Sequence, residues 1–559
     1  MTSPSASSAQ TTTNSRRRWV SLLFISLGIS MIMVDATVVN VVLPSVVRDL
    51  SLSSTQAEWV IAIYPLVFAA LLVTFGSVGD RVGRRRVFIL GAIGFVAASI
   101  LVASAGSPEV LIAGRFLQGI AGAAMLPTSL SLVNAIFTGR DRPIAFGIWG
   151  AVIGGMSAIG PLLGGWLTTT ATWRLAFWIN VPIGITLVVG SLLLVPESRN
   201  AAAQKGLDFV GVLLSAVGLG LIVLALIEGQ RYGWWIASED LSLLGFTFES
   251  GSLSGIPLAM ALGAIVLAGF FYWQLRQTRL GQPVLLDLTL FRIPSFAYGN
   301  VVALIVQFGE FGLIFVLPVY LVNVLGYSAL QAGGVIALVA LGVFIGGPSA
   351  GQLAAQRGGR LVVRLGMALE IAGMAWVAWL ISPTTSTWAM APGLVVYGAG
   401  VGFATAQLTN VLLSDVPVAK SGQASGAQST TRQVGAALGI AVLGAVLFTG
   451  IGSFVADEVA ATGAVSAQEA QIVGSTAQAT AATSVPLLPN PEVQLAAEQG
   501  VVRAAQAAIW TAIGFVVLGL IATLRLPDDL ALRRAREAAA EAEAEAEAEA
   551  EATEAEAGA

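Results

Sequence analysis

Long apolar stretches alternate with short polar ones along almost the whole chain. Fourteen of these stretches reach the length of about 20 residues that a helix needs to cross a bilayer. They lie near residues 19–43, 59–79, 87–106, 109–134, 144–168, 173–195, 207–228, 255–275, 296–322, 329–352, 361–382, 387–412, 424–450 and 501–525. The pattern predicts an all-α polytopic membrane protein with 14 transmembrane helices.

Composition and charge placement support a membrane protein with a defined orientation. Only 11% of residues are charged, against about 25% in soluble domains. If the first span starts in the cytoplasm, most of the 28 Lys and Arg residues fall on cytoplasmic segments. The exceptions are Arg48, Arg174, Arg231 and Arg503 outside, and Arg115 and Arg432 within spans. The positive-inside rule therefore places both termini in the cytoplasm and the chain in the cytoplasmic membrane.

The residues that are missing exclude several classes of function. The chain has no Cys and no His, so proton transfer must use Asp, Glu, Arg or Tyr. Neither lysine, Lys205 or Lys420, belongs to a phosphate-binding loop. We expect no enzymatic activity, no cofactor, no bound metal and no nucleic-acid partner, and we expect a monomer in contact with membrane lipid.

A repeated motif suggests how the spans are grouped. "GSVGDRVGRRRVF" (76–88) follows the second span, and "GQLAAQRGGRLVV" (351–363) follows the tenth. The copies align glycines and an arginine, but Ala355 stands where the first copy has Asp80. Both copies end an even-numbered span, which indicates two parallel six-helix halves.

The predicted organisation has five parts. Residues 1–15 form a disordered tail, 16–196 the N-terminal six-helix bundle, 197–280 two inserted helices with an outer loop, 281–525 the C-terminal six-helix bundle with a long outer loop at 451–500, and 526–559 an acidic Ala/Glu tail in the cytoplasm.

Polar side chains inside the spans are the candidate functional residues, because a charge at the bilayer centre costs about 2.5–3.5 kcal/mol or more. Asp35 lies in the first span, Arg115 in the fourth and Glu310 in the ninth. The polar cavity candidates near them are Gln118, Asn300, Gln307, Gln407 and Asn410. Asp35, Arg115 and Glu310 are predicted to couple proton movement to transport. The alternative for each is a structural ion pair or hydrogen bond.

Several stretches resemble the major facilitator superfamily, in particular its fourteen-helix drug:proton antiporters. The gate motif is Gly76, Asp80, Arg81, Gly83, Arg84 and Arg85. "LIAGRFLQGIAGAAMLP" (111–127) resembles the family's arginine motif, and "VDATVVNVVLP" (34–44) and "WRLAFWINVPIG" (173–184) resemble that branch. "GIWGAVIGGMSAIGPLLGGWL" (147–167) resembles the antiporter motif, with Gly154, Gly160, Pro161 and Gly164. The resemblance covers residues 16–525 and implies antiport.

The predicted function is proton-coupled export of hydrophobic, cationic drugs or toxins by alternating access. One alternative is export of a specific metabolite, lipid or siderophore by the same fold. The other is a non-transporting membrane protein or a membrane subunit of an ATP-driven complex.

Overall fold

The computed structural model describes residues 15–199, 206, 208–237, 240–243 and 246–527. The first half contains α1 (Ser15–Leu50), α2 (Ser54–Val82), α3 (Arg84–Ala103), α4 (Pro108–Ile136), α5 (Asp141–Thr170), α6 (Leu175–Trp178) and α7 (Asn180–Leu194). The inserted segment contains α8 (Phe209–Tyr232), β1 (Leu241–Leu243), β2 (Phe246–Phe248) and α9 (Gly255–Arg279). The predicted terminal tails lie outside the described residues, apart from their inner ends.

The remaining elements form the second half. They are η1 (Leu288–Arg292), α10 (Pro294–Asn323), α11 (Ala329–Arg357), α12 (Gly359–Leu380), α13 (Thr387–Leu412), η2 (Val418–Lys420), α14 (Ser421–Ala461), α15 (Ala467–Ala479), η3 (Val485–Leu487), α16 (Pro491–Ala522) and η4 (Thr523–Arg525). Among the described residues, 14 spans are long and apolar enough to cross a membrane, with α6 and α7 together forming one of them. This confirms the predicted fold class and number of spans.

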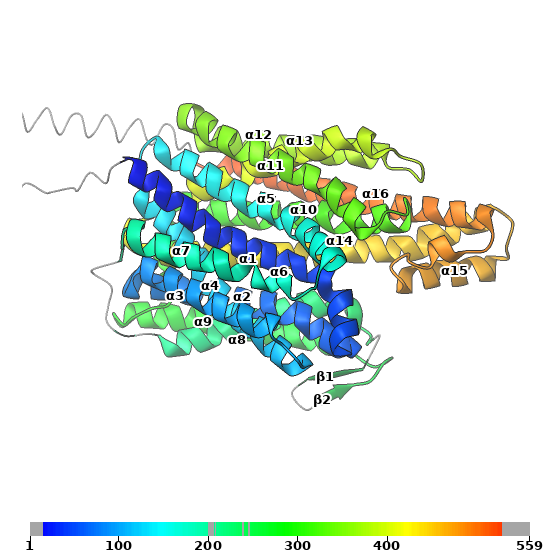
Figure 1. Ribbon diagram of the computed structural model, residues 1–559, viewed down its shortest axis with the longest axis horizontal. Coiled ribbons are helices and arrows are strands. Elements are labelled where there is room, and N and C mark those ends of the chain that lie inside the picture. Colours follow the sequence, from blue (N-terminus) through cyan, green and yellow to red (C-terminus); the bar gives the residue numbers. More distant parts are fainter. Residues whose placement is uncertain (1–14, 200–205, 207, 238–239, 244–245, 528–559) are drawn as a thin grey trace, which may run out of the picture.

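The two halves meet along two seams. α2 packs against α14, and α5 packs against α11 and α13. The inserted helices α8 and α9 pack on each other, and α8 also contacts α2 and α14 (Figure 1). The inserted pair therefore covers one of the two seams between the halves.

The repeat found in the sequence has the same local structure in both copies. α2 begins with a capping box formed by Ser53 and Gln56, and α11 begins with one formed by Ser328 and Gln331. Such a box satisfies backbone N–H groups that a helix start leaves free. Each helix then ends at a glycine with positive φ, +123° at Gly83 and +87° at Gly358.

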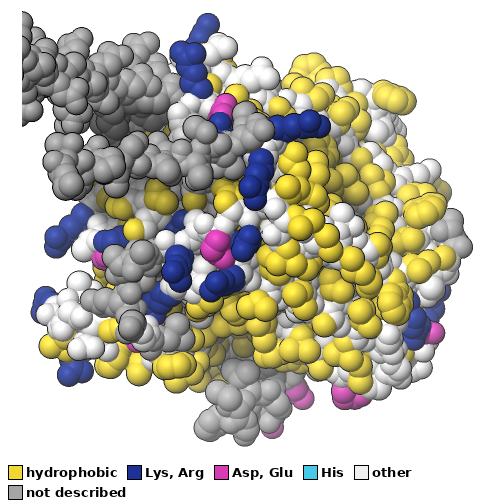
Figure 2. All heavy atoms as spheres, turned by 60° about the vertical axis from the view of Figure 1, so that its left-hand side comes forward, with side chains coloured by type: hydrophobic (Ala, Val, Ile, Leu, Met, Phe, Trp, Pro, Cys, Tyr) yellow, Lys and Arg dark blue, Asp and Glu magenta, His cyan; other side chains and the backbone are white. Residues whose placement is uncertain are grey.

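Basic side chains gather at one end of the bundle. Figure 2 shows Lys and Arg side chains (dark blue) on the part of this end that the grey atoms leave visible, beside a broad hydrophobic surface (yellow). We call it the arginine end and define it by Arg81, Arg84–Arg86 and Lys420. The start of α1 lies at this end, whereas α15 lies at the opposite end (Figure 1).

The segment predicted as a long outer loop is mostly helical. α14 continues to Ala461, beyond the predicted span end at 450, and α16 begins at Pro491, before the predicted start at 501. α15 packs against α14, with Ala470 and Ala477 buried. The connection between the last two spans is helical because Ala-rich sequence favours helix even outside the apolar window that defines a span.

Candidate functional site

Asp35 lies at the centre of a buried polar network in the first half. Arg115 on α4 donates from Nη1 to its Oδ2 at 2.5 Å. Gln118 on α4 and Asn180 on α7 donate to its Oδ1 at 2.9 and 3.0 Å. Both amides also donate to Ser99 on α3. The side chains of Asp35 and Arg115 are fully buried, so four helices converge on one ion pair.

Aromatic rings enclose the guanidinium of this pair. The Tyr64 ring centroid lies 4.5 Å from Arg115 Cζ, and the Phe177 centroid lies at 6.0 Å. A cation over a ring face in a desolvated site gains about 2 kcal/mol. Arg115 also donates from Nε to the backbone oxygen of Val60 at 3.4 Å. The arginine is therefore fixed by α2, α4 and α6 as well as by the carboxylate on α1.

The sequence prediction found Asp35, Arg115 and Gln118 but missed the other network members. Asn180 carried a usable signal, because it is a polar residue in an apolar span within the stretch "WRLAFWINVPIG". Ser99 and Tyr64 had none, since small hydroxyls and tyrosines are common on membrane helices for packing alone.

Glu310 on α10 forms a second buried network, in the other half. Gln307 donates from Nε2 to Glu310 Oε2 at 2.8 Å, and Arg432 on α14 donates from Nε to Gln307 Oε1 at 2.7 Å. Thr405 on α13 donates to the same carboxyl oxygen at 3.4 Å, and the Tyr397 hydroxyl donates to the Glu310 backbone oxygen at 2.6 Å. An amide thus stands between acid and arginine here, in contrast to the direct pair at Asp35.

The remaining cavity candidates lie elsewhere. Asn300 donates back to Phe296 on its own helix. Gln407 on α13 donates to the backbone oxygen of Pro143 on α5 at 3.0 Å, and Asn410 donates to Gln407. The structure therefore places Gln407 and Asn410 at a contact between the halves near the arginine end, and not beside Glu310.

The gate motif joins the two halves through Asp80. The Asp80 carboxylate accepts two hydrogen bonds from Arg84, at 3.0 and 2.7 Å. It also accepts the backbone N–H groups of Gly422 and Gln423, at 2.8 and 2.9 Å. These N–H groups belong to the first turn of α14, where a helix favours a negative charge. Asp80 on α2 thus caps a helix of the opposite half, and Arg84 adds a bond to the Val418 backbone oxygen at 2.5 Å.

The other motif arginines attach the surrounding connections. Arg81 donates to the backbone oxygens of Gly206 and Val284, at 2.7 and 2.6 Å, on either side of the inserted helices. Arg85 donates to the Val195 backbone oxygen at 3.1 Å, at the end of α7.

Asp287, in the connection that follows the inserted helices, bonds to residues at the start of α14. Asp287 accepts a bond from Lys420 at 2.5 Å, and its backbone N–H donates to Gln423. Partial burial acts to raise the pKa of Asp287, but hydrogen bonds from Lys420 and Thr289 outweigh it and hold the pKa below the usual value.

Glycines bring the halves close at the arginine end. A Cβ on Gly76 would lie 2.3 Å from the Gly422 backbone oxygen, and one on Gly351 would lie 2.7 Å from Cα of Ile144. These glycines occupy equivalent positions in the repeat, so both seams close in the same way.

The glycines of the antiporter motif serve two interfaces. A Cβ on Gly154 would contact Val343 of α11 at 2.9 Å. Cβ atoms on Gly160 and Gly164 would instead meet Thr37 and Val38 of α1. The motif helix, which contains Pro161, is therefore packed tightly against both its own half and the other one.

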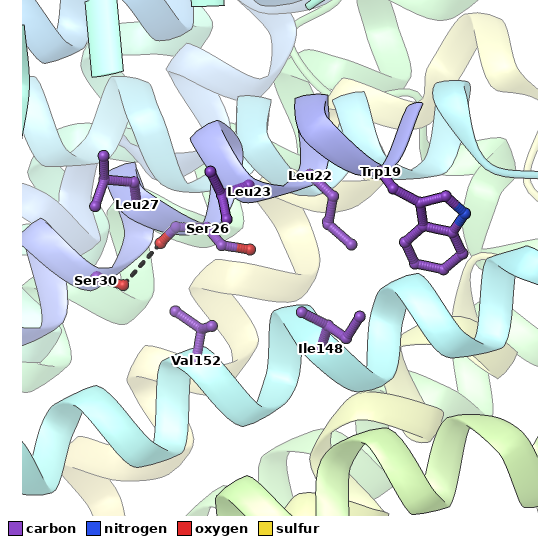
Figure 3. A pocket seen from close by; sticks show the side chains of 8 residues that line it. All are labelled: Trp19, Leu22, Leu23, Ser26, Leu27, Ser30, Ile148 and Val152. Carbon is purple, nitrogen blue, oxygen red and sulfur yellow. Dashed lines mark hydrogen bonds between the residues drawn. The ribbon is translucent and has the colours of Figure 1, made fainter. Parts of the chain in front are cut away.

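A surface groove lies between α1 and α5 and has a volume of about 360 Å³ (Figure 3). Its lining is Trp19, Leu22, Leu23, Ser26, Leu27, Ser30, Ile148 and Val152. Leu23 is 64% exposed, so the groove opens at the surface. None of the predicted site residues lines it, and it is separate from the Asp35 network.

The structure is that of a polytopic membrane transporter. It has fourteen spans among the described residues, two halves held together at the arginine end, and a network of an acid and an arginine inside each half. The comparisons give the family. The family model described as Major Facilitator Superfamily matches residues 25–440, and the chain belongs to this family.

Bacterial relatives are similar over most of the chain. The "Probable actinorhodin transporter" of Streptomyces coelicolor is 35% identical over 78% of this chain and 74% of its own length. The "Tetracenomycin C resistance and export protein" of Streptomyces glaucescens is 32% identical over 79% and 78%. The "Multidrug efflux pump LfrA" of Mycolicibacterium smegmatis is 32% identical over 78% and 82%.

A solved structure shares the fold. The crystal structure of the human organic anion transporter MFSD10 has a TM-score of 0.54 and 15% sequence identity, and the match covers 90% of this chain and 99% of that one.

Proposed function

We propose that this protein exports hydrophobic, cationic drugs or toxins across the cytoplasmic membrane in exchange for protons. The observation that carries the proposal is the Asp35–Arg115 pair, a titratable group fully buried where four helices of one half converge. The names of relatives, which include antibiotic exporters and a multidrug efflux pump, support the cargo class. The partners are a small hydrophobic molecule, protons and membrane lipid.

The arginine end faces the cytoplasm in this proposal, by the positive-inside rule. Asp80, Arg84 and the paired glycines then hold the transporter closed toward the cytoplasm. In this conformation Asp35 receives a proton from the acidic outside. When the other end closes and the cytoplasmic end opens, the proton leaves and Arg115 stabilises the carboxylate.

Proton entry supplies enough free energy for this exchange. One pH unit is worth about 1.4 kcal/mol, and a membrane potential of 100 mV adds about 2.3 kcal/mol per charge. These free energies set the substrate gradient that proton entry can support, because 1.4 kcal/mol corresponds to about a tenfold ratio of substrate concentrations across the membrane.

The test uses purified protein in liposomes with an imposed pH gradient and lipophilic cationic dyes as substrates. We expect dye-induced proton movement in the native protein and a clear decrease in the number of protons moved per dye cation in Asp35→Asn, with dye binding retained. Asp49→Asn is the matched control on the same helix. Hydrogen bonds from Arg174 and Trp173 hold the pKa of Asp49 below its usual value, so Asp49 stays ionised and its variant keeps full coupling. Full coupling in Asp35→Asn would contradict the proposed role.

Export of one specific metabolite is the second candidate. It is supported by a relative named "Riboflavin transporter RibZ" from Clostridioides difficile, 28% identical over 76% of this chain. A native protein that moves protons with no dye of the panel but does so with a single metabolite would favour this candidate.

A further inference from the structure

Glu370 is a buried carboxyl group that none of the networks described above uses. It lies in the middle of α12 and is 0% exposed. Neither carboxyl oxygen has a hydrogen-bond partner among the described residues. Gly400 on α13 gives the side chain its room, because a Cβ there would lie 2.9 Å from Glu370 Cγ.

Within the part of the chain that the structure describes, no cation pairs with this carboxyl group. The two arginines of α12 bond elsewhere, Arg360 to the backbone oxygen of Leu524 and Arg364 to Thr523. The titratable groups that act on Glu370 from neighbouring helices are Glu310 of α10 and Tyr397 of α13. In the described chain α11 contributes Arg357, its last residue, and α16 contributes Glu492, Glu498 and Arg503, of which Arg503 pairs with Glu458 of α14.

A charge count of the interior of the second half points to one bound proton. Among the described residues, this half buries two carboxyl groups, Glu310 and Glu370, and the guanidinium that reaches the network of Glu310 is that of Arg432. The guanidinium can balance one carboxylate. Glu310 has that cation within its network and two side-chain donors, whereas Glu370 has no donor at all. An ionised, unpaired group in the membrane interior is costly by several kcal/mol.

We infer that Glu370 binds a second exchangeable proton, which it holds in this conformation and releases to water on the cytoplasmic side during the transport cycle. The inference rests on the proposed antiport and extends it. When the O–H bond of the Glu370 carboxyl group breaks, the proton leaves as a hydrated ion and the electron pair stays on the oxygen. Two carboxylates then face one guanidinium. The excess negative charge favours a cationic substrate, so the proton and the cation exchange for each other.

The first test asks whether Glu370 is protonated, and it does not depend on transport. Infrared spectra of purified protein with isotope-labelled glutamate resolve the carbonyl stretch of protonated carboxyl groups. We expect such a band at neutral pH in the native protein and in the control Glu492→Gln, where an exposed carboxylate is replaced. We expect its loss in Glu370→Gln. A native spectrum without a protonated glutamate, or an unchanged band in Glu370→Gln, would overturn the inference.

The second test asks whether that proton is exchanged. In liposomes we expect the number of protons moved per dye cation to fall from two in the native protein to one in Glu370→Gln. An unchanged ratio in a variant that has lost the infrared band would show a permanently neutral acid and overturn the exchange. In the native protein, the band must also weaken when a cationic dye binds; a band that stays constant contradicts the inference without reference to any variant. Absence of proton coupling in the native protein would instead refute the proposed antiport, and the infrared result would still stand.

Discussion

The contact between Asp80 and the start of α14 allows a quantitative prediction about the transport cycle. Its carboxylate bonds to Arg84 within one half and to the N–H groups of Gly422 and Gln423 in the other. Only the bonds to α14 break when the halves separate at the arginine end. Asp80→Asn keeps the size of the side chain, removes its charge and turns one acceptor into a donor that faces an N–H group.

The size of the effect follows from these bonds. A hydrogen bond to a charged group contributes about 1.5–3 kcal/mol, and a neutral one about 1 kcal/mol. With one bond weakened and one lost, we expect the closed form to lose about 2–5 kcal/mol relative to the open form. That corresponds to a shift of roughly 30- to 4,000-fold in their ratio.

Spin-label distances across the arginine end can measure this shift. The chain has no cysteine, so Thr138→Cys and Gln356→Cys provide exposed labelling sites, one in each half, without background. We expect longer distances to dominate in Asp80→Asn. Asp457→Asn, an exposed carboxylate of α14 near the opposite end, serves as the control and keeps the native distribution. A native distribution in a folded Asp80→Asn protein would refute the assignment of Asp80 as a latch between the halves.

Three further predictions test other contacts. Arg115→Gln leaves the Asp35 carboxylate buried without its cation, so we expect a loss of about 3–5 kcal/mol in unfolding free energy, measured by thermal unfolding in detergent. If the double variant of Arg115→Gln and Asp35→Asn loses the sum of both single effects, the two side chains do not stabilise each other and the prediction is wrong. Gly76→Ala places a methyl group against backbone of the other half, and we expect longer distances between spin labels at Thr138→Cys and Gln356→Cys. Gly94→Ala, whose added Cβ has ordinary spacing of 3.6 Å, is expected to keep the native distances. Asp287 has a lowered pKa when folded, so its contribution to the free energy of unfolding is present above its unfolded pKa of about 3.9 and is lost as pH falls. Asp287→Asn should lower the free energy of unfolding by less than about 1 kcal/mol at pH 7, because the pair is partly exposed. A stability difference between variant and native protein that persists in full below about pH 3 would contradict this.

Which groups partner each buried charge was decided by the tertiary structure. The sequence showed that Asp35 and Arg115 needed an explanation, but Asn180 and Ser99 joined them only through the packing of α3 and α7. Asp80 bonds to Arg84, four residues further along the chain, and also to the first turn of α14, more than 300 residues further along. For Glu370, tertiary packing instead removed possible partners, because the arginines of its own helix, Arg360 and Arg364, bond to η4.

The sequence by itself determined the spans, their number and the gate and antiporter motifs. It could do so because a bilayer requires a continuous apolar run of fixed length in each span, and because turns and close helix contacts require glycine at particular positions. Pairing between buried polar groups follows no such local rule. It depends on how helices distant in the sequence rotate and approach one another. For that reason only the tertiary structure revealed the contact of Asp80 with α14 between the halves and the absence of a partner for Glu370 among the described residues.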